Sequence, residues 1–421
     1  VPGWDCHGLP IEWEVESKYR KSGKNKDDIP VVDFRRECRN FAKKWIDVQS
    51  NQFKRMGVSA NWKDIYTTMD FSSEAKIVEE LGLFLFNGYL YKGERPVLWS
   101  VVEKTALAEA EVEYQDHTSD TIIVSFPIIK TDKNFLKDTS LLIWTTTPWT
   151  IPGNRAVAYG SEIDYVVIKA TKTSKDSLAK KNERLLVALS LLDKALAEMG
   201  ISEFDKEETF RGSDLEGTIC EHPLRGKGYE HDVPAVSGDF VTVEAGTGFV
   251  HIAPGHGEDD FQLGKKHNLE IPKTVGPDGK FYETVPIFSG KHVYKVDSEI
   301  IELLKDCEKL KSVGKTTHSY PHSWRSKAPL IFRITPQWFI SLSKNNLRKR
   351  ALDAVEKVLW FPKASKNRIK SMIEARPDWC ISRQRAWGVP IPIFVNKKTN
   401  ELLLDKKVFS LCKNLEKIII P

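Results

Sequence analysis

The sequence predicts an α/β protein with a mainly β section in its middle, and three patterns indicate this division. Apolar residues recur at intervals of three and four up to about residue 95, as on the buried faces of helices; they are Ile11, Val15, Tyr19, Phe34, Cys38, Phe41, Trp45 and Val48. Short apolar runs of strand length follow, with turns between them, near 121–128, 141–146, 164–169, 184–189 and 247–252. From His318 an α/β pattern returns. We therefore expect a β-barrel-like domain with a few helices between two α/β portions.

Taken in order, these elements define three predicted segments. Residues 1–116 hold the helical section and the stretch after Pro96 that leads into the first strand. Residues 117–317 hold the strands; within them 211–240, rich in Gly and charge, is predicted to form surface loops, and 275–283 contains a turn signal. Residues 318–421 hold the second α/β portion, with a strand predicted at 330–335 before a long helical segment.

Composition indicates a folded protein of two to three domains, since the 421 residues are 41% hydrophobic, 29% charged and 10% aromatic. No stretch is long and apolar enough to span a bilayer, and the first residues have no signal-peptide layout. We therefore expect no membrane partner and a cytoplasmic location. The six cysteines are scattered without a C-x-x-C pair, which favours reduced thiols over disulfides or a zinc knuckle.

The first motif with candidate chemistry is WTTTPWTIPGNR at residues 144–155. The apolar run 141–144 predicts a strand, which Pro148 ends after three threonines. Threonines at a strand end present hydroxyl donors and acceptors on both faces, with side chains that are stiff at χ1. They suit a small polar pocket, although the same pattern also occurs in ordinary strand-to-turn segments.

The second motif, GTGFVHIAPGHGEDDF at residues 246–261, has the same layout. A predicted buried strand runs into a Pro-Gly turn that delivers three acids, Glu258, Asp259 and Asp260. A carboxylate at this place would hold an ammonium group. Two alternatives stay open: a solvated acidic turn, and a metal site built from His251, His256 and Asp260. The metal site is disfavoured because no cysteine or second histidine pair supports it.

Together the two motifs resemble the isoleucyl-tRNA synthetases, which are class I aminoacyl-tRNA synthetases. The first is similar to the editing-pocket signature of the enzymes for branched aliphatic amino acids, where valyl and leucyl enzymes carry TTRPET or TTRPDT. Thr147 replaces that Arg and Trp149 the acid, as in isoleucyl enzymes. The flanks extend the resemblance across essentially the whole chain: residues 2–12 are PGWDCHGLPIE, against GTDHAG in valyl and GWDAFG in leucyl enzymes, and residues 379–388 are WCISRQRAWG.

The resemblance implies a β-barrel-like editing domain inserted between two parts of a Rossmann-type catalytic domain. Residues 117–317 would be the editing domain; 1–116 and 318–421 would hold catalytic parts and connective segments. The implied catalytic group is Asp260, Thr146, Thr147 and His251, and the implied substrate-binding group is Thr145, Trp149, Thr150, Asn154 and Gly248. Within these groups Asp260 would anchor the α-ammonium of a misattached valine, and His251 would crowd out the larger isoleucine.

The resemblance also implies a synthetic isoleucine pocket. Asp5 would pair with the ammonium of isoleucine, while Gln384 and Trp387 would shape its other wall. Without the resemblance, Asp5 is equally a turn residue or helix cap, and Trp379 and Trp387 are equally core aromatics.

Cofactors and partners follow from the same resemblance. Neither an HIGH-like signature nor a KMSKS-like loop is present, so this segment is not expected to activate amino acids; ATP and Mg²⁺ are expected for the full-length enzyme only. No metal is expected, because Ser100, Glu103 and Ser323 occupy the places of zinc-binding cysteines in some relatives, although His318 and His322 remain as candidate ligands. The implied partners are the acceptor end of tRNA(Ile) and the valyl and isoleucyl esters, and a monomer is expected.

Charge supports a nucleic-acid partner at one place. The net charge of +5 is too small to indicate a partner, but residues 341–370 hold nine Lys or Arg against two acids, interleaved with Trp360 and Phe361. This stretch is either a solvated helix face or a surface that tracks the phosphates of the tRNA acceptor arm. In the second case its affinity falls with salt.

The expected function is part of an isoleucine-tRNA ligase, with post-transfer editing in this segment. A hydrophobic site separates isoleucine from valine by only roughly 1–3 kcal/mol, so translation fidelity requires a second site that hydrolyses Val-tRNA(Ile). Positioning would supply most of the rate, and a hydroxyl of the terminal ribose would assist in place of a protein base. The alternatives are a tRNA-binding module with an inactive pocket, a valyl-type domain acting on Thr-tRNA, and an unrelated serine or cysteine hydrolase, for which no G-x-S-x-G elbow is present.

Overall fold

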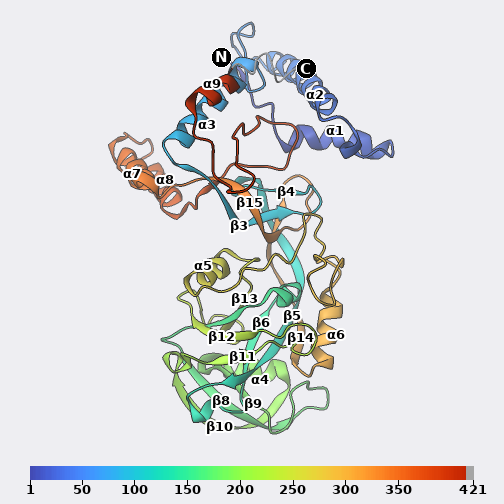
Figure 1. The fold of residues 1–421 in the computed structure, drawn as a ribbon, viewed down its shortest axis with the longest axis vertical. Coiled ribbons are helices and arrows are strands. Elements are labelled where there is room, and N and C mark those ends of the chain that lie inside the picture. Colours follow the sequence, from blue (N-terminus) through green and yellow to red (C-terminus); the bar gives the residue numbers. More distant parts are fainter. Residues whose placement is uncertain (414–421) are drawn as a thin grey trace. The chain divides into compact units, whose positions relative to one another are not determined.

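The computed structural model describes residues 1–413 and divides into two compact units (Figure 1). Unit 1 joins Val1–Gly93 to the chain from Pro336 onward, and unit 2 is Glu94–Thr335. The borders fall inside strands β3 (Leu90–Ser100) and β15 (Ile331–Ile340). The sequence placed them at 116/117 and 317/318, which lie inside one continuous ladder where His117 pairs with His318. The end of the last predicted segment, 414–421, lies outside the described residues.

Unit 1 is mostly helical. Its helices are α1 (Leu9–Lys21), α2 (Val31–Arg55), α3 (Phe71–Phe86), α7 (Leu347–Lys357), α8 (Ser365–Ala375) and α9 (Lys406–Lys413). Strand β1 (Gly3–Trp4) pairs in parallel with β2 (Tyr66–Thr67). A four-stranded sheet has the order β16-β15-β3-β4. Of its strands, β16 (Trp379–Cys380) lies in unit 1, β3 and β15 contain the borders, and β4 (Thr105–Ala106) falls within the residues of unit 2. The long helical segment predicted after the strand at 330–335 is thus two helices, α7 and α8.

The long helix α2 buries one stripe of residues four apart, Phe34, Cys38, Ala42 and Ile46. This stripe packs with Val15 of α1 in one core. The predicted face was close to the observed one but wrong at Trp45, whose side chain is 44% exposed. Because four residues exceed one turn of about 3.6, the buried stripe drifts slowly around the helix axis, so Ile46 is buried in place of Trp45.

Unit 2 is built on a mixed sheet of ten strands. They are β5 (Val112–Lys130), β6 (Ser140–Thr145), β7 (Ala156–Tyr159), β8 (Asp164–Thr173), β9 (Arg184–Ala188), β10 (Ile201–Arg211), β11 (Ile219–Glu221), β12 (Asp232–Ser237), β13 (Phe249–Ile252) and β14 (Leu310–Ser323). Their order is β10-β8-β9-β6-β5-β11-β12-β7-β13, and β14 pairs with β5. The pairs β6/β9 and β7/β12 are parallel and the others antiparallel.

All five runs predicted as strands are strands. Among the described residues, no pairing joins the two ends of the path, β10 and β13, into a closed ring. The barrel-like detail of the predicted fold is therefore unconfirmed, while a mainly β domain within a larger α/β chain is confirmed.

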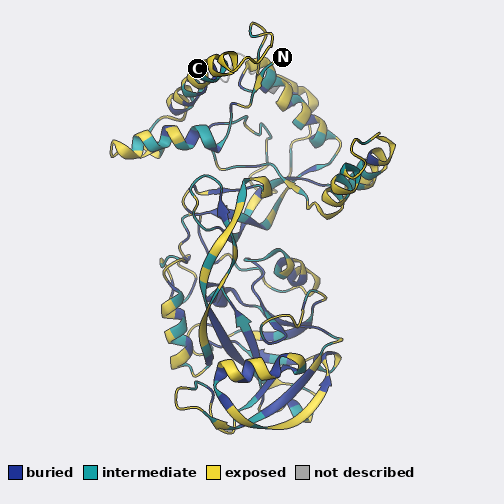
Figure 2. Ribbon diagram, turned by 180° about the vertical axis from the view of Figure 1, so that it is seen from behind, coloured by how far each residue is buried: buried dark blue, intermediate teal, exposed yellow. Residues whose placement is uncertain are grey.

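Three helices belong to unit 2: α4 (Leu192–Met199), α5 (Glu258–Lys266) and α6 (Asp297–Asp306). One core forms where α4 covers strands β6, β8 and β9, with Leu142, Val166, Leu185 and Leu196 almost fully buried. Figure 2 shows these strands as mostly buried. A six-residue helix of 3₁₀ type, η4 (Pro148–Gly153), follows β6 after two residues and is buried along its whole length.

The prediction of surface loops at 211–240 was wrong. The stretch contains β11 and β12, and Cys220, His222 and Leu224 are completely buried. Its glycines lie at turns, where Gly217, Gly226 and Gly228 take positive φ angles. Several residues between those turns are buried, so the average composition of the segment wrongly indicated an exposed loop.

Candidate active site

The threonine motif forms a compact hydrogen-bonded turn after β6. The N–H of Thr147 donates to Oγ1 of Thr145 over 3.1 Å, and the hydroxyls of these two residues lie 3.2 Å apart. The hydroxyl of Thr150 donates to the carbonyl of Thr147 over 2.8 Å. Thr146 and Thr147 are partly exposed, whereas Thr145 and Thr150 are buried. The motif therefore presents a rigid polar surface with one open side.

His251, in the middle of β13, lies at the centre of this surface. Its Nδ1 is 3.3 Å from Nδ2 of Asn154, and its Nε2 is 2.8 Å from Oγ1 of Thr150. Because an amide nitrogen only donates, Nδ1 must accept and Nε2 must carry the proton and donate to Thr150. Burial, reinforced by His256, lowers the pKa of His251 to about 4. The side chain is therefore a neutral imidazole with a fixed tautomer and both nitrogens engaged.

Asn154 completes this arrangement. Its Nδ2 also donates to the carbonyl of Ala156 over 2.9 Å, which fixes the orientation of the amide. Its Oδ1 is buried and has no hydrogen-bond partner within residues 1–413. A buried acceptor without a partner is uncommon in a folded protein and marks a place where a donor is missing.

Asp260 lies in the first turn of α5 and accepts a hydrogen bond from the N–H of Ala253 over 2.9 Å. Burial raises the pKa of its carboxyl to about 6, against the lowering effect of that bond. Gly257 makes this position possible, because a Cβ there would lie 2.1 Å from Oδ2 of Asp260. The result is a carboxylate held by backbone, near β13, whose charge is not matched by a cation among the described residues.

Trp149 and Gly248 are each held in place by a close contact. The Trp149 ring meets the His256 ring edge-on, with 4.9 Å between centroids. His256 in turn donates from Nδ1 to the carbonyl of Phe332 over 2.9 Å. Gly248 takes φ of +80°, and a Cβ there would lie 2.3 Å from that of Ala188. Trp149 is thus a buried side chain of η4, and Gly248 allows the close approach of its backbone to Ala188.

The residues expected for a synthetic pocket all lie in unit 1, whereas the residues of the two motifs described above lie in unit 2. Asp5 is exposed and accepts a hydrogen bond from the hydroxyl of Thr68 over 3.2 Å. Gln384 donates to Oε1 of Gln337 over 3.1 Å. Trp387 is 1% exposed and donates from Nε1 to the carbonyl of Cys6 over 2.7 Å. The indole of Trp387 is therefore a core group of unit 1.

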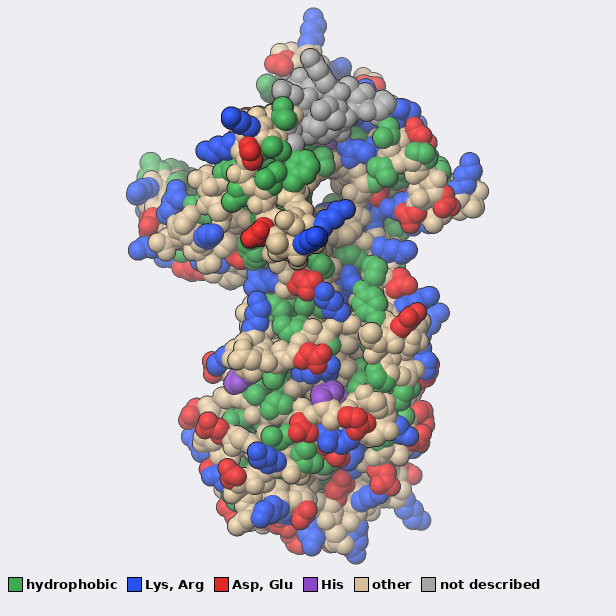
Figure 3. Space-filling model, in the orientation of Figure 1, with side chains coloured by type: hydrophobic (Ala, Val, Ile, Leu, Met, Phe, Trp, Pro, Cys, Tyr) green, Lys and Arg blue, Asp and Glu red, His purple; other side chains and the backbone are tan. Residues whose placement is uncertain are grey.

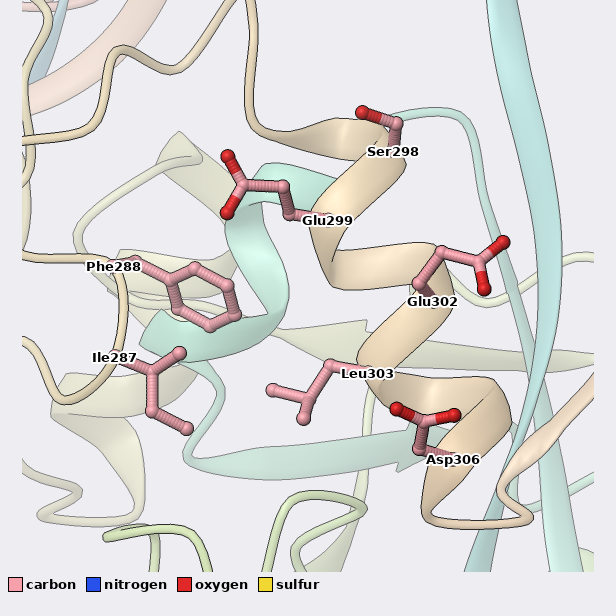
Figure 4. A pocket seen from close by; sticks show the side chains of 7 residues that line it. All are labelled: Ile287, Phe288, Ser298, Glu299, Glu302, Leu303 and Asp306. Carbon is pink, nitrogen blue, oxygen red and sulfur yellow. The ribbon is translucent and has the colours of Figure 1, made fainter.

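Two cavities in the structure are separate from the predicted residues. One of about 710 Å³ in unit 1 lies between α3 and residues 379–391, and none of Asp5, Gln384 and Trp387 lines it. The other, of about 370 Å³, lies against α6 in unit 2 and is drawn in Figure 4, with Phe288 and Leu303 beside the acids Glu299, Glu302 and Asp306.

The places expected to hold zinc ligands in some relatives form a hydrogen-bonded cluster instead. The hydroxyl of Ser323 donates to Oε1 of Glu103 over 2.7 Å, and the N–H of Glu103 donates to Oγ of Ser100. Over residues 1–413, no three His, Cys, Asp or Glu side chains gather as a metal ion would require. Within the same range no helix has the length and apolar character to cross a membrane. The five cysteines whose side chains are described are free thiols; the side chain of Cys412 lies outside the described set.

Sequence reasoning missed the groups that hold η4 from behind. Nε2 of His222 lies next to the carbonyl of Ile151 in this helix, and Nε2 of His231 next to that of Asn154, just after it. The carboxyl of Asp297, at the start of α6, lies near the backbone of Trp149. Burial raises the pKa of Asp297 to about 7. No local pattern indicates these residues, because each partner lies more than 70 residues away along the chain.

Comparison with known proteins agrees with the motifs. The family model of tRNA synthetases class I (I, L, M and V) matches residues 1–418. The isoleucine--tRNA ligase of Pelagibacter ubique is 53% identical over 408 residues, covering 97% of this chain and 45% of the relative. The isoleucine--tRNA ligase of Gluconobacter oxydans is also 53% identical, over 422 residues, which cover 97% of this chain and 44% of the relative. The chain thus spans about 45% of the length of the curated relatives it matches.

Solved structures show weaker likeness. A chain described as GlLeuRS-CP1 is 15% identical with a TM-score of 0.35, covering 45% of this chain and 97% of that one. The LeuRS-tRNA-LeuAMS ternary complex of Agrobacterium radiobacter K84 is 15% identical with a TM-score of 0.30. The match covers 97% of this chain and 44% of that one. Scores this low add nothing to the family match.

The family predicted from the two motifs and the flanks is confirmed by a match that runs through both units. The chain belongs to the class I tRNA synthetases of the I, L, M and V group.

Proposed function

We propose that unit 2 is an editing domain of the isoleucyl type, which hydrolyses the ester that joins valine to the terminal adenosine of tRNA(Ile). The observation that carries this proposal is the polar network in which Asn154 and Thr150 hold both nitrogens of His251, beside the threonines of β6 and η4. Identity of 53% to isoleucine--tRNA ligases supports the choice of amino acid.

The α-ammonium of the misattached valine is bound by Asp260. Burial raises the pKa of this carboxyl, so its charged form is poorly stabilised while the pocket is empty. A substrate ammonium would restore that stabilisation by a charge-assisted hydrogen bond. Valine binding therefore completes an incomplete ion pair, and the ester carbonyl is fixed relative to it.

Isoleucine is excluded by the ring of His251. The ring is 9% exposed and held at both nitrogens, so it does not swing away to admit a further methylene. Rejection of a larger side chain by a rigid wall costs the enzyme nothing in binding the smaller one. This is the steric filter that a second sieve requires.

Hydrolysis proceeds by positioning. His251 has no free nitrogen and a pKa near 4, so it does not accept a proton from water at neutral pH. Thr146 and Thr147, on the open side of the motif, orient the adenosine and the attacking water, and the unpaired Oδ1 of Asn154 accepts from a substrate or water donor. A hydroxyl of the terminal ribose assists the water. Fixed geometry supplies most of the rate.

Within the whole enzyme, we place this chain in an isoleucine-tRNA ligase, a monomer that uses ATP and Mg²⁺ for amino-acid activation. Asp5 and Gln384 belong to the isoleucine pocket of unit 1. Trp387 supports that pocket from the core, where its indole N–H holds the backbone next to Asp5.

The acceptor arm of tRNA binds the helices α7 and α8 and the loop between them. Figure 3 shows Lys and Arg side chains gathered over this part of unit 1. The loop also exposes Leu359 and Phe361, each 87% accessible. Basic side chains around exposed aromatic and apolar groups are typical of surfaces that bind phosphates and unpaired bases together.

The direct test of the proposal is amino-acid release from Val-tRNA(Ile), with Thr-tRNA(Val) as the competing substrate, by the purified chain and by Asp260→Asn. We expect valine release that the variant loses. Preference for Thr-tRNA(Val) would identify a valyl-type domain instead. Binding of tRNA without cleavage of either ester would identify an inactive pocket, and cleavage blocked by serine- or thiol-directed reagents would identify an unrelated hydrolase.

A further inference from the structure

The segment that carries Thr150 and Asn154 is held from behind by two histidines of another part of unit 2. Nε2 of His222 lies 3.1 Å from the carbonyl oxygen of Ile151, inside η4. Nε2 of His231 lies 3.0 Å from the carbonyl oxygen of Asn154, just after η4. Ile151, Asn154 and His222 are completely buried, so water does not reach the bond of His222, whereas His231 is only partly buried.

The tautomer of His222 is fixed by its surroundings. The N–H of Leu224 donates to Nδ1 over 3.1 Å, so Nδ1 has no proton and Nε2 must donate to the carbonyl of Ile151. The ring stacks on Tyr229, with centroids 4.9 Å apart and planes 14° apart. This imidazole therefore has one orientation and one proton position.

The charges around both histidines favour the neutral form. Arg155 faces both rings, Arg225 and Glu270 face His231, and His251 faces His222. Burial is the first cause that lowers the pKa of each ring. His231, Arg155 and His251 lower the pKa of His222 further; Arg155 and Arg225 lower that of His231, and Glu270 raises it. His222 is therefore a directed N–H donor in place of a cation, whereas Nε2 of His231 faces both the carbonyl of Asn154 and the donor Nη1 of Arg155, 3.4 Å away.

We propose that His222 and His231 are positioning residues of the editing pocket, which fix Thr150 and Asn154, and through them His251. His222 does so by donating Nε2–H to the carbonyl of Ile151 in η4, and His231 by its contacts with the carbonyl of Asn154 and with Arg155. This inference rests on the proposed editing function. It assigns a role in the reaction to two residues that touch neither His251 nor the threonine hydroxyls directly.

The two histidines contribute unequally to fixing η4. The carbonyl of Ile151 accepts from the N–H of Asn154 and from His222. The carbonyl of Asn154 accepts from His231 and also from Nη1 of Arg155 over 2.6 Å. Each carbonyl therefore keeps one donor when its histidine is lost. The contact of His222 is fully buried, so no water replaces its N–H, whereas the contact of His231 is only partly buried and water can take its place.

The test compares His222→Phe, which keeps a stacking ring without a donor, with His222→Gln, whose amide restores a donor near the position of Nε2. We expect kcat for valine release to fall roughly 10- to 100-fold in His222→Phe with KM little changed, and to return most of the way in His222→Gln. His231→Phe should lose less. Ser125→Ala is the matched control, since it removes another buried donor to a carbonyl, that of Lys309, and should keep wild-type kcat.

Equal loss in His222→Phe and His222→Gln would overturn the proposal, because only the shape of the buried ring would then matter. Wild-type kcat in a folded His222→Phe protein would also overturn it. A second readout does not depend on activity: the ¹⁵N shifts of His251 report its tautomer. They should change in His222→Phe and return in His222→Gln; unchanged shifts would refute positioning even if the wild-type chain released no valine, which would count against the editing function alone.

Discussion

Among single residues, Asp260 has the ionisation on which the proposed binding step depends. Its carboxyl pKa is raised to about 6, so the carboxylate that binds an ammonium is lost as the pH falls through about 6. We expect kcat/KM for Val-tRNA(Ile) release, measured between pH 5 and 7, to decline below that point. Asp260→Asn keeps an acceptor for Ala253 but no charge, and should lower kcat/KM at pH 7 by roughly 10- to 100-fold.

The matching control is the shape of the pH profile in the variant, which should be flat over the same range. A wild-type inflection that persists unchanged in Asp260→Asn would mean that another group titrates, and the ammonium role would be wrong.

Gly248 is the second residue with a sharp expectation. Its φ of +80° and the 2.3 Å approach of a Cβ to Ala188 predict that Gly248→Ala lowers the free energy of unfolding by about 1–3 kcal/mol. Urea unfolding would measure it. Gly217→Ala is the control, because Gly217 has a similar φ of +76° but open space around the Cβ position. Equal losses in both variants would show that the contact with Ala188 contributes nothing.

Residue chemistry alone indicated a polar pocket at the threonines and an ammonium-binding carboxylate, whereas the pocket roles of His251 and Asn154 were implied by the family resemblance. Threonines at a strand end and acids after a Pro-Gly turn are local patterns, and the structure brings Thr145, Thr150 and His251 together. His222 could not be found this way. A single histidine forms no periodic pattern, and the role of His222 depends on its contact with a carbonyl 71 residues away in the sequence.

At the scale of elements, the sequence predicted those whose apolar residues follow a regular spacing. Strands β6, β8, β9 and β13 contain short apolar runs, and each was predicted; of β5 only the apolar part near 121–128 was predicted, since its first half is polar and mostly exposed. Strand β10 alternates few apolar residues with many charged ones, because it is exposed along most of its length, and it was not predicted. Edge strands of this kind have no hydrophobic signal.

The helices α7 and α8 give a prediction for tRNA binding. Lys357 and Lys363 make no ion pair within the described residues, whereas Lys366 pairs with Glu356. Lys357→Gln with Lys363→Gln should reduce the slope of log affinity against log salt by about 1 per lysine lost. Filter binding at several salt concentrations would measure it.

Lys366→Gln is the control for this pair of substitutions, since Glu356 already neutralises Lys366, and it should change the slope less. Equal slopes in all variants would mean that the basic helices are only a solvated face.

At the scale of the whole molecule, each compact unit has a hydrophobic core of its own, one around Phe34 and Cys38 and another around Leu142 and Val166. Phe34→Ala should cost about 3–5 kcal/mol in unit 1. Hydrogen exchange followed by mass spectrometry should then show lost protection in the described parts of unit 1, with Glu94–Thr335 protected as before. Loss of protection in both units would show that they unfold together.

The family was predictable because it depends on motifs and on flanks. The borders of the units were not, because they depend on which strands pair. The ladder between β5 and β14 joins residues about 200 apart in sequence, from Val112 opposite Ser323 to Val124 opposite Leu310. No property of either strand alone reveals that partner.

The most direct test of the central claim is the ratio of kcat/KM for release of valine and isoleucine from tRNA(Ile), in the wild-type chain and in His251→Ala. The proposed pocket predicts strong preference for valine in the wild type and a ratio that falls toward one in the variant, because the rigid ring that excludes isoleucine is gone. A wild-type chain that cleaves both esters alike, or a variant that keeps the full preference, would contradict it.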